Sequence, residues 1–106
     1  LPPWTSYLAV AHTTIVGTCS FVAPPDAECV VEIAYFTFPG HERRGYASAM
    51  AAELAALAAN ARPAIRLRAH TLREQNASTR ILEKLGFTRV GESIDEDAGA
   101  VWRWER

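Results

Sequence analysis

The residues with the clearest chemical potential form the segment HERRGYASAM, at positions 41–50. Arg43 and Arg44 stand directly before Gly45, and a helix-forming run follows. A helix N-terminus carries unpaired N–H groups and a partial positive charge, and a glycine there lets the backbone approach a ligand closely. The guanidinium groups and the Ser48 hydroxyl add further donors. The segment therefore predicts a phosphate cradle, although a solvated basic turn fits the same local residues.

Hydrophobic periodicity and turn signals predict the elements that position this segment. Alternating runs and runs rich in β-branched and aromatic residues predict six strands, at Ser6–His12, Thr14–Ala23, Cys29–Phe38, Ala64–Leu72, Phe87–Ser93 and Gly99–Arg106. Runs of helix formers predict two helices, at Gly45–Ala61 and Asn76–Gly86. The order β-β-β-α-β-α-β-β implies one parallel pair with a right-handed crossover, while the hairpins supply antiparallel pairs. The predicted fold class is α/β (α+β), with a mixed, mostly antiparallel sheet and two helices.

The two predicted helices carry core and capping signals. The first helix has apolar residues at helical spacing, and these mark the stripe that is expected to be buried. They are Met50, Leu54, Leu57 and Ala61. In the second helix, Asn76 or Ser78 can cap the N-terminus, and Gly86 suits the left-handed conformation common at a C-terminus.

Composition limits the class of protein. The 106 residues fit one domain, and the 49% of hydrophobic residues predict a folded core. A net charge of -1 argues against a nucleic-acid binder, and no apolar run approaches the roughly 20 residues of a membrane-spanning helix. The start lacks a basic signal-peptide region, so a cytoplasmic protein is expected. Cys19 and Cys29 are expected to be small buried side chains, with a cross-strand disulfide as the alternative, and the scattered histidines predict no metal site.

Two motifs resemble the GNAT superfamily of N-acetyltransferases. ERRGYA, at Glu42–Ala47, is similar to its acetyl-CoA loop, whose pattern is Q/R-x-x-G-x-G/A. NASTRILEKLGF, at Asn76–Phe87, resembles the second signature, and it is closest to the branch that includes ribosomal-protein N-terminal acetyltransferases. The strand VEIAYFTFPGHE resembles the same branch, and the resemblance extends from Ser6 to Arg106. It implies the acyl-CoA N-acyltransferase (GNAT) fold and direct acetyl transfer from acetyl-CoA to a primary amine of a small molecule or a protein N-terminus.

The resemblance also implies where acetyl-CoA binds. In this superfamily the strand before the loop splays away from the next parallel strand, and the pantetheine arm pairs with its backbone. By position, Phe36, Thr37 and Phe38 would line that arm, and Asn76 would hydrogen-bond the cofactor near its pantetheine end. The pyrophosphate would be held by the backbone of a loop made of Glu42, Arg43, Arg44, Gly45, Tyr46, Ala47 and Ser48. The pattern has Gln or Arg where this chain has Glu42, and an acidic side chain beside a pyrophosphate is unfavourable unless it points away.

Direct acetyl transfer needs a neutral amine, a base for its proton and an acid for the leaving thiolate. Many superfamily members use a tyrosine as the acid, but Leu82 occupies that position here and cannot donate. Ser78 lies one turn earlier on the same helix face and is the acid that the branch implies, with a capping role as its alternative.

Glu32 is the candidate base, directly or through water. Burying a carboxylate in an apolar strand costs free energy, so its presence there suggests a function. A paired or edge-facing carboxylate is the alternative. His70 shares a strand face with Arg66 and Arg68, which is expected first to be solvated or covered by a partner, and His70 is the weaker candidate base.

Superfamily members normally begin with a strand and two helices, whereas this chain has five residues ahead of Ser6. Those helices usually form part of the acceptor wall. We therefore expect an uncovered apolar sheet surface and a homodimer. The implied partners are acetyl-CoA and an amine acceptor, with no nucleic acid, membrane or metal. The alternative is a non-catalytic module that binds acyl-CoA or a protein partner with the same sheet.

Overall fold

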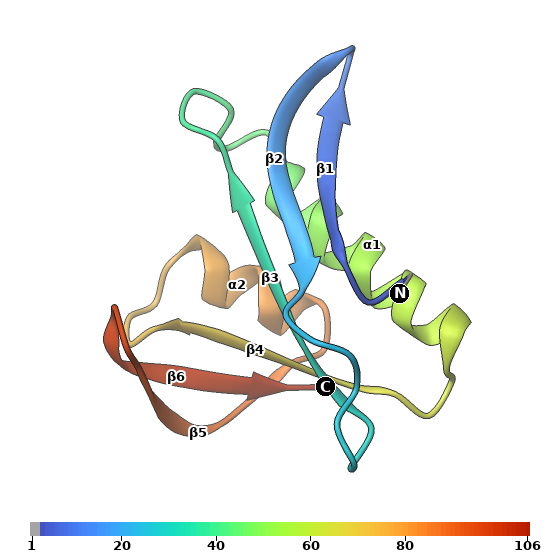
Figure 1. The fold of residues 1–106 in the computed structure, drawn as a ribbon. Coiled ribbons are helices and arrows are strands. Elements are labelled where there is room, and N and C mark those ends of the chain that lie inside the picture. The colour runs from blue at the N-terminus through green and yellow to red at the C-terminus, as the bar shows by residue number, and fades with distance from the viewer. Residues whose placement is uncertain (1–2) are drawn as a thin grey trace.

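The computed structural model describes residues 3–106, and Figure 1 shows a sheet with two helices packed on it. The strands are β1 (Ser6–Ala11), β2 (Thr14–Phe21), β3 (Val30–Thr37), β4 (Arg66–Leu72), β5 (Thr88–Asp95) and β6 (Gly99–Glu105). The helices are α1 (Tyr46–Ala61) and α2 (Ala77–Lys84). The sheet order is β1-β2-β3-β4-β6-β5, and β3 pairs with β4 in parallel while the other neighbours pair antiparallel. The predicted element order and the mixed, mostly antiparallel sheet are confirmed.

Turn conformations explain where the strands end. β1 ends at Ala11, one residue before the predicted end, because His12 and Thr13 form the hairpin turn with φ of 51° and 68°. Two successive residues with positive φ give the turn a twist that matches the flanking strands. β5 continues to Asp95, two residues past the predicted end, because Asp95 pairs with Gly99. The acidic stretch is therefore a tight hairpin turn and not a longer loop.

β3 and β4 diverge part-way along their length (Figure 1). Their paired residues are Val30 with Arg66, Val31 with Leu67, and Glu32 with Arg68. Beyond these pairs, β3 continues with β2 and β4 continues with β6. Within residues 3–106, the edge of β3 that faces β4 therefore has no strand partner from Ile33 to Thr37. Backbone N–H and C=O groups along this edge are left without a ladder partner.

Both helices lie on the same side of the sheet, and α1 packs on β2 and β3 (Figure 1). The buried residues of α1 are Met50, Ala51, Leu54 and Ala58. The predicted stripe is right for Met50 and Leu54, but Leu57 is half-buried, and Ala61 is exposed where burial was expected. Alanines lie on every side of this helix, so its apolar pattern is nearly uniform. The sequence therefore could not fix which stripe meets the sheet.

The hydrophobic core lies between this face of the sheet and the two helices. Leu54 of α1 and Leu82 of α2 are both 0% exposed. Trp104 is buried on β6, and its indole N–H donates to the Thr71 hydroxyl at 2.9 Å. The one polar group of that large side chain is thus paired inside the core.

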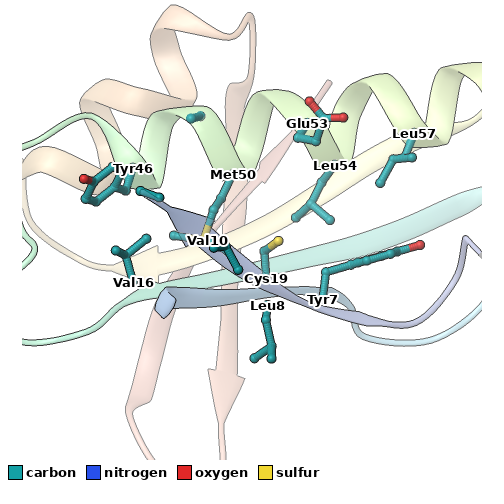
Figure 2. Close-up of a pocket in the computed structure, with 13 residues that line it drawn as sticks. Tyr7, Leu8, Val10, Val16, Cys19, Tyr46, Met50, Glu53, Leu54 and Leu57 are labelled. Atoms are coloured by element: carbon teal, nitrogen blue, oxygen red, sulfur yellow. The ribbon is translucent and has the colours of Figure 1, made fainter. Parts of the chain in front are cut away.

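The opposite face of β1, β2 and β3 is uncovered within residues 3–106. Leu8 and Phe36 are 61% and 57% exposed, and each pairs with Thr18 on the strand between them. Figure 2 shows Leu8 pointing away from α1, whereas Tyr7 and Cys19 lie beneath that helix. The three residues Leu8, Thr18 and Phe36 are called the open-face ladder below.

Candidate functional site

The loop before α1 leaves the helix N-terminus open. Gly45 is the N-cap, with φ of 80°, and no side chain caps the N–H groups of the first turn. A Cβ added to Gly45 would meet no atom within 4 Å, so glycine is favoured here by the positive φ and not by crowding. Arg43 also has a positive φ, of 66°. The first-turn N–H groups are therefore available to an anion.

A cavity of about 510 Å³ lies between this loop, the start of α1 and one side of α2; it is called the basic cavity below. Three cationic side chains line it, Arg43 from the loop and Arg80 and Lys84 from α2. The two α2 residues are four positions apart and so project from the same side of the helix. The other lining residues are Thr37, His41, Glu42, Gly45, Tyr46, Ala47, Ser48, Ala77, Ser78 and Ile81. Clustered positive charge and open N–H groups suit a phosphate group.

The structure places six of the seven predicted loop residues in this wall, while Arg44 is not among the lining residues. Sequence reasoning did not identify His41, Arg80 or Lys84 as part of the site. The spacing of Arg80 and Lys84 on the polar side of a predicted helix was an available signal. His41 begins the segment at positions 41–50, but nothing in the pattern gave its side chain a role.

Two buried polar atoms belong to residues of this wall and have no hydrogen-bond partner within residues 3–106. They are the hydroxyl oxygen of Thr37 and Nδ1 of His41. Buried polar atoms are paired in the great majority of cases, so an unpaired one needs an explanation. A polar ligand in the basic cavity would supply partners for both. The residues present therefore fit a phosphate-bearing cofactor.

The Glu42 side chain is oriented by the loop's own backbone. Its Oε1 accepts a hydrogen bond from the Gly40 N–H at 2.8 Å. Hydrogen bonds from its own N–H and from that of Gly40 lower the pKa of this carboxyl, and the charges of His41 and Arg43 add to the effect. Glu42 still lines the basic cavity, so its negative charge opposes anion binding there.

Side chains along the end of β3 alternate between the two sides of the sheet. Thr37 lines the basic cavity, whereas Phe36 is exposed and Phe38 is half-buried. The two phenylalanine rings lie 6.0 Å apart, centroid to centroid. Of these three predicted residues, Thr37 is the one whose side chain reaches the cavity. The larger contribution of β3 to the candidate site is its unpaired backbone edge.

α2 begins with a reciprocal cap. Asn76 Oδ1 accepts from the Thr79 N–H at 3.1 Å, and Thr79 Oγ1 accepts from the Asn76 N–H at 3.0 Å. The side chain of Asn76 is thus used by the helix, and Asn76 does not line the basic cavity. Of the two predicted caps, Asn76 takes the role and Ser78 does not. The Ser78 hydroxyl makes no hydrogen bond to another of the described residues and remains free for a ligand.

Ser78 borders two cavities. It lines the basic cavity and also a smaller cavity of about 150 Å³ between the diverging strands β3 and β4, called the cleft cavity below. The cleft cavity is lined by Glu32, Ile33, Ala34, Tyr35, Ala69, His70, Thr71 and Ser78. Burial raises the pKa of Tyr35 to about 12, so its hydroxyl is protonated at neutral pH. The structure thus brings Glu32 and Ser78, the two predicted catalytic residues, to one cavity.

Glu32 is paired across the opening between the strands. Its Oε2 lies 3.0 Å from Nδ1 of His70, and the two side chains are 37% and 25% exposed. Arg68, the strand neighbour of Glu32, instead binds Glu105 at 2.8 Å. The carboxylate therefore has a histidine partner that sequence reasoning did not assign to it.

A further cavity, of about 400 Å³, lies between α1 and β1 (Figure 2). Its walls are mostly apolar and include Met50, Leu54 and Leu57. Burial raises the pKa of the Cys19 thiol, and the charge of Glu53 adds to this shift. A thiol in that state is a poor nucleophile. This cavity is mostly apolar, and neither of the two predicted catalytic residues lines it.

Cys19 and Cys29 are both free thiols. Residues 3–106 contain no cluster of three His, Cys, Asp or Glu side chains placed to hold a metal ion. Neither helix in that range is long and apolar enough to cross a membrane.

Comparison with known proteins identifies relatives of this fold. Residues 2–88 match the family described as Acetyltransferase (GNAT) domain. YjdG, an uncharacterized N-acetyltransferase of Bacillus subtilis (strain 168), is 34% identical over 73 residues, which make up 69% of this chain and 44% of YjdG. RimL, a ribosomal alpha-N-protein acetyltransferase solved in complex with coenzyme A, has a TM-score of 0.83 and 20% identity over 95% of this chain and 60% of its own. A dodecameric spermidine N-acetyltransferase from Vibrio cholerae has a TM-score of 0.81 and 15% identity over 95% of this chain and 63% of its own.

The chain spans less than two thirds of the length of each of these relatives. The two solved structures confirm the acyl-CoA N-acyltransferase fold that the motifs predict. The family match covers the loop at the start of α1, the diverging strands and all of α2, which are the elements that build the site. On this match, the chain belongs to the GNAT acetyltransferase family.

Proposed function

We propose that this chain is the catalytic domain of an acetyl-CoA-dependent N-acetyltransferase, which acts on a primary amine of a small molecule or a protein N-terminus. The observation that carries the proposal is the position of Ser78, which lines both the basic cavity and the cleft cavity. A cofactor held by its phosphates in the first cavity could therefore extend its acyl end into the second. The coenzyme A complex of RimL, which has the same fold, supports this choice of cofactor.

Each part of acetyl-CoA has a matching feature in the chain. The pyrophosphate would lie against the open N-terminus of α1, near Arg43, Arg80 and Lys84. The pantetheine arm would pair with the unpaired backbone edge of β3, at residues 33–37. The acetyl group would lie in the cleft cavity.

Bound acetyl-CoA supplies an acyl group that is activated as a thioester. The amine nitrogen forms a bond to the acyl carbon as the carbon–sulfur bond breaks. Glu32 accepts the proton that the amine loses, directly or through water, and the Ser78 hydroxyl donates a proton to the leaving sulfur. Proton exchange with solvent then returns Glu32 to the carboxylate and Ser78 to the hydroxyl. Glu32 belongs to β3 and Ser78 to α2, so the base and the acid reach the cleft cavity from different elements.

Arg43→Ala should raise the Kd for acetyl-CoA about tenfold, because it removes a charge-assisted donor from the basic cavity. Arg44→Ala makes the same chemical change in the next residue, which does not line the cavity, so we expect less than about a twofold effect. Titration calorimetry of both variants measures the difference. The same titration at higher ionic strength should weaken binding to the wild type more than to Arg43→Ala.

The outcome that would reject the cradle is the absence of acetyl-CoA binding by folded wild-type protein. Equal losses in both arginine variants would contradict a contact at Arg43 and would indicate a diffuse electrostatic effect.

Glu42→Gln should tighten acetyl-CoA binding by about two- to fivefold, because it removes a negative charge from the basic cavity. The glutamine oxygen can still accept the hydrogen bond from the Gly40 N–H that holds the loop. Since the pKa of Glu42 is lowered in the folded protein, its carboxylate stabilises the loop at neutral pH, and this contribution is lost as pH falls through that pKa. Calorimetry at neutral pH tests the substitution, with Glu42→Ala as the variant that loses both the charge and the loop hydrogen bond. Weaker binding by Glu42→Gln would show that the charge is not what limits affinity.

The alternative function is a non-catalytic module that binds acyl-CoA or a protein partner. The uncovered face of β1 to β3 favours it, because no described residue forms an acceptor wall there. Thioester turnover with a panel of small amines and N-terminal peptides separates the two functions. Binding of acetyl-CoA without turnover on any amine would favour the module.

We also propose a homodimer formed through the open-face ladder, supported by the exposure of Leu8 and Phe36. A monomer in light scattering at micromolar concentration would contradict the dimer.

A cytoplasmic location is part of the proposal as well, supported by the two free thiols, which suit a reducing compartment.

A further inference from the structure

We propose that His70 is a positioning residue for Glu32, which holds the base at the opening of the sheet with one carboxylate oxygen left free for the amine proton. The inference rests on the proposed transferase function. It assigns a role to a contact between two strands whose residues are 38 positions apart in the sequence.

The divergence of β3 and β4 creates the contact. Glu32 is the last residue of β3 that pairs with β4, and its partner there is Arg68. His70 lies two residues beyond Arg68, so its side chain points to the same side of β4. The strands separate at this level, and the hydrogen bond from His70 to Glu32 spans the beginning of the gap.

The proposed role of Glu32 as a base sets the direction of the hydrogen bond, because a base must be ionised. An ionised carboxylate only accepts hydrogen bonds, so Nδ1 of His70 carries the hydrogen and donates to Oε2 of Glu32 at 3.0 Å. Oε1 of Glu32 has no partner among the described residues. Both side chains line the cleft cavity, where the amine would meet the acyl carbon. His70 thus restrains one oxygen of Glu32 and leaves the other for the proton.

The charged groups around the pair leave His70 as the partner of Glu32. Arg68 is the nearest cation along β4, but its guanidinium binds Glu105, with Nε at 2.9 Å from Oε2. Arg103 of β6 stands opposite His70 in the sheet, and its guanidinium lies over Gly91 of β5. Asp95 of β5 is a further charged group near His70. Hydrogen bonds from the N–H groups of Ala98 and Asp97 lower the pKa of its carboxyl, and the charge of His70 adds to the effect.

In the proposed step, the nitrogen–hydrogen bond of the amine breaks, and Oε1 of Glu32 takes the proton as the nitrogen bonds to the acyl carbon. His70 keeps its own proton throughout. A carboxylate free to rotate would present the oxygen in the right position for only part of the time. Misplacement of a catalytic group by about 1 Å lowers rates by about 100-fold.

The test compares His70→Leu with His70→Asn in steady-state kinetics. Leucine has no donor, and we expect it to lower kcat by about 10- to 100-fold while the KM for acetyl-CoA stays within about twofold. The side-chain nitrogen of asparagine lies close to where Nδ1 lies, so His70→Asn should recover kcat to within about fivefold of the wild type. His12→Asn makes the asparagine change at an exposed hairpin turn, where asparagine tolerates the φ of 51°, and should leave kcat unchanged.

A double variant identifies the route of the effect. If His70 acts through Glu32, His70→Leu should lower kcat much less in a Glu32→Gln background than in the wild type. An equal loss in both backgrounds, an asparagine variant no better than leucine, or an unchanged kcat in folded His70→Leu would each overturn the proposal. If the wild type turns over no amine, the transferase function itself has failed. If the wild type is active and His70→Leu is equally active, the function stands and the role of His70 is rejected.

Discussion

Ser78→Ala should lower kcat for acetyl transfer by about 100-fold or more, while the Kd for acetyl-CoA stays within about twofold of the wild type. The Ser78 hydroxyl is free because Asn76 and Thr79 form the cap of α2. It lines both the basic cavity and the cleft cavity, where the sulfur of a bound thioester would lie. Loss of the acid slows departure of the thiolate without removing a contact to the phosphates. The measurement is steady-state turnover together with calorimetric titration of acetyl-CoA.

Two variants control this prediction. Ser78→Thr keeps the hydroxyl and should retain more activity than Ser78→Ala. Ser93→Ala removes a hydroxyl from β5, away from both cavities, and should leave kcat unchanged. An unchanged kcat in folded Ser78→Ala would exclude the serine as the acid. A loss of acetyl-CoA affinity with unchanged kcat would make Ser78 a binding residue instead.

The order of the elements could be predicted because each depends on a local pattern. Strand alternation, alanine-rich helix formers and breakers such as Pro39 and Gly40 all act within a few residues. The loop at the start of α1 was predictable for the same reason, since Arg43 and Gly45 are close in sequence. The local pattern left the loop's function open, because a phosphate-binding loop and a solvated basic turn have the same local residues. They differ only once α2 is placed against the loop.

The rest of the candidate site depends on contacts between distant segments. Arg80 and Lys84 meet Arg43 in one wall after the chain has passed through α1 and β4. Glu32 meets His70 where two strands stop pairing, and no pattern within either strand marks that point. Long-range pairing of this kind follows from the packing of the whole sheet. Sequence reasoning could therefore propose Glu32 as a base but could not supply its partner.

Leu82→Ala should lower the free energy of unfolding by about 2–5 kcal/mol, because Leu82 is 0% exposed in the core beneath α2. That loss is a large part of the roughly 5–15 kcal/mol that stabilises a typical domain. It should lower the melting temperature by about 10–20 °C or more. Leu72→Ala is the matched control, since Leu72 is 52% exposed, and a surface substitution usually changes stability by about 0.5 kcal/mol or less. Denaturant unfolding of both variants measures the difference, and equal losses would contradict the placement of Leu82 in the core.

Because Leu82 is fully buried, replacing it with tyrosine is not expected to restore the acid that many superfamily members have at this position. A tyrosine in this filled site adds volume, and overpacking of a core costs about 1–3 kcal/mol. Leu82 does not line either the basic or the cleft cavity, so a tyrosine that stayed in its place would not reach the acyl group. We therefore expect Leu82→Tyr to be destabilised and to leave the low kcat of Ser78→Ala unrepaired when the two changes are combined. Recovery of kcat in the combined variant would mean that α2 can turn to present position 82 to the cleft cavity. In that case the rotation of α2 would decide which of its residues serves as the acid, and position 78 would not be the only one able to do so.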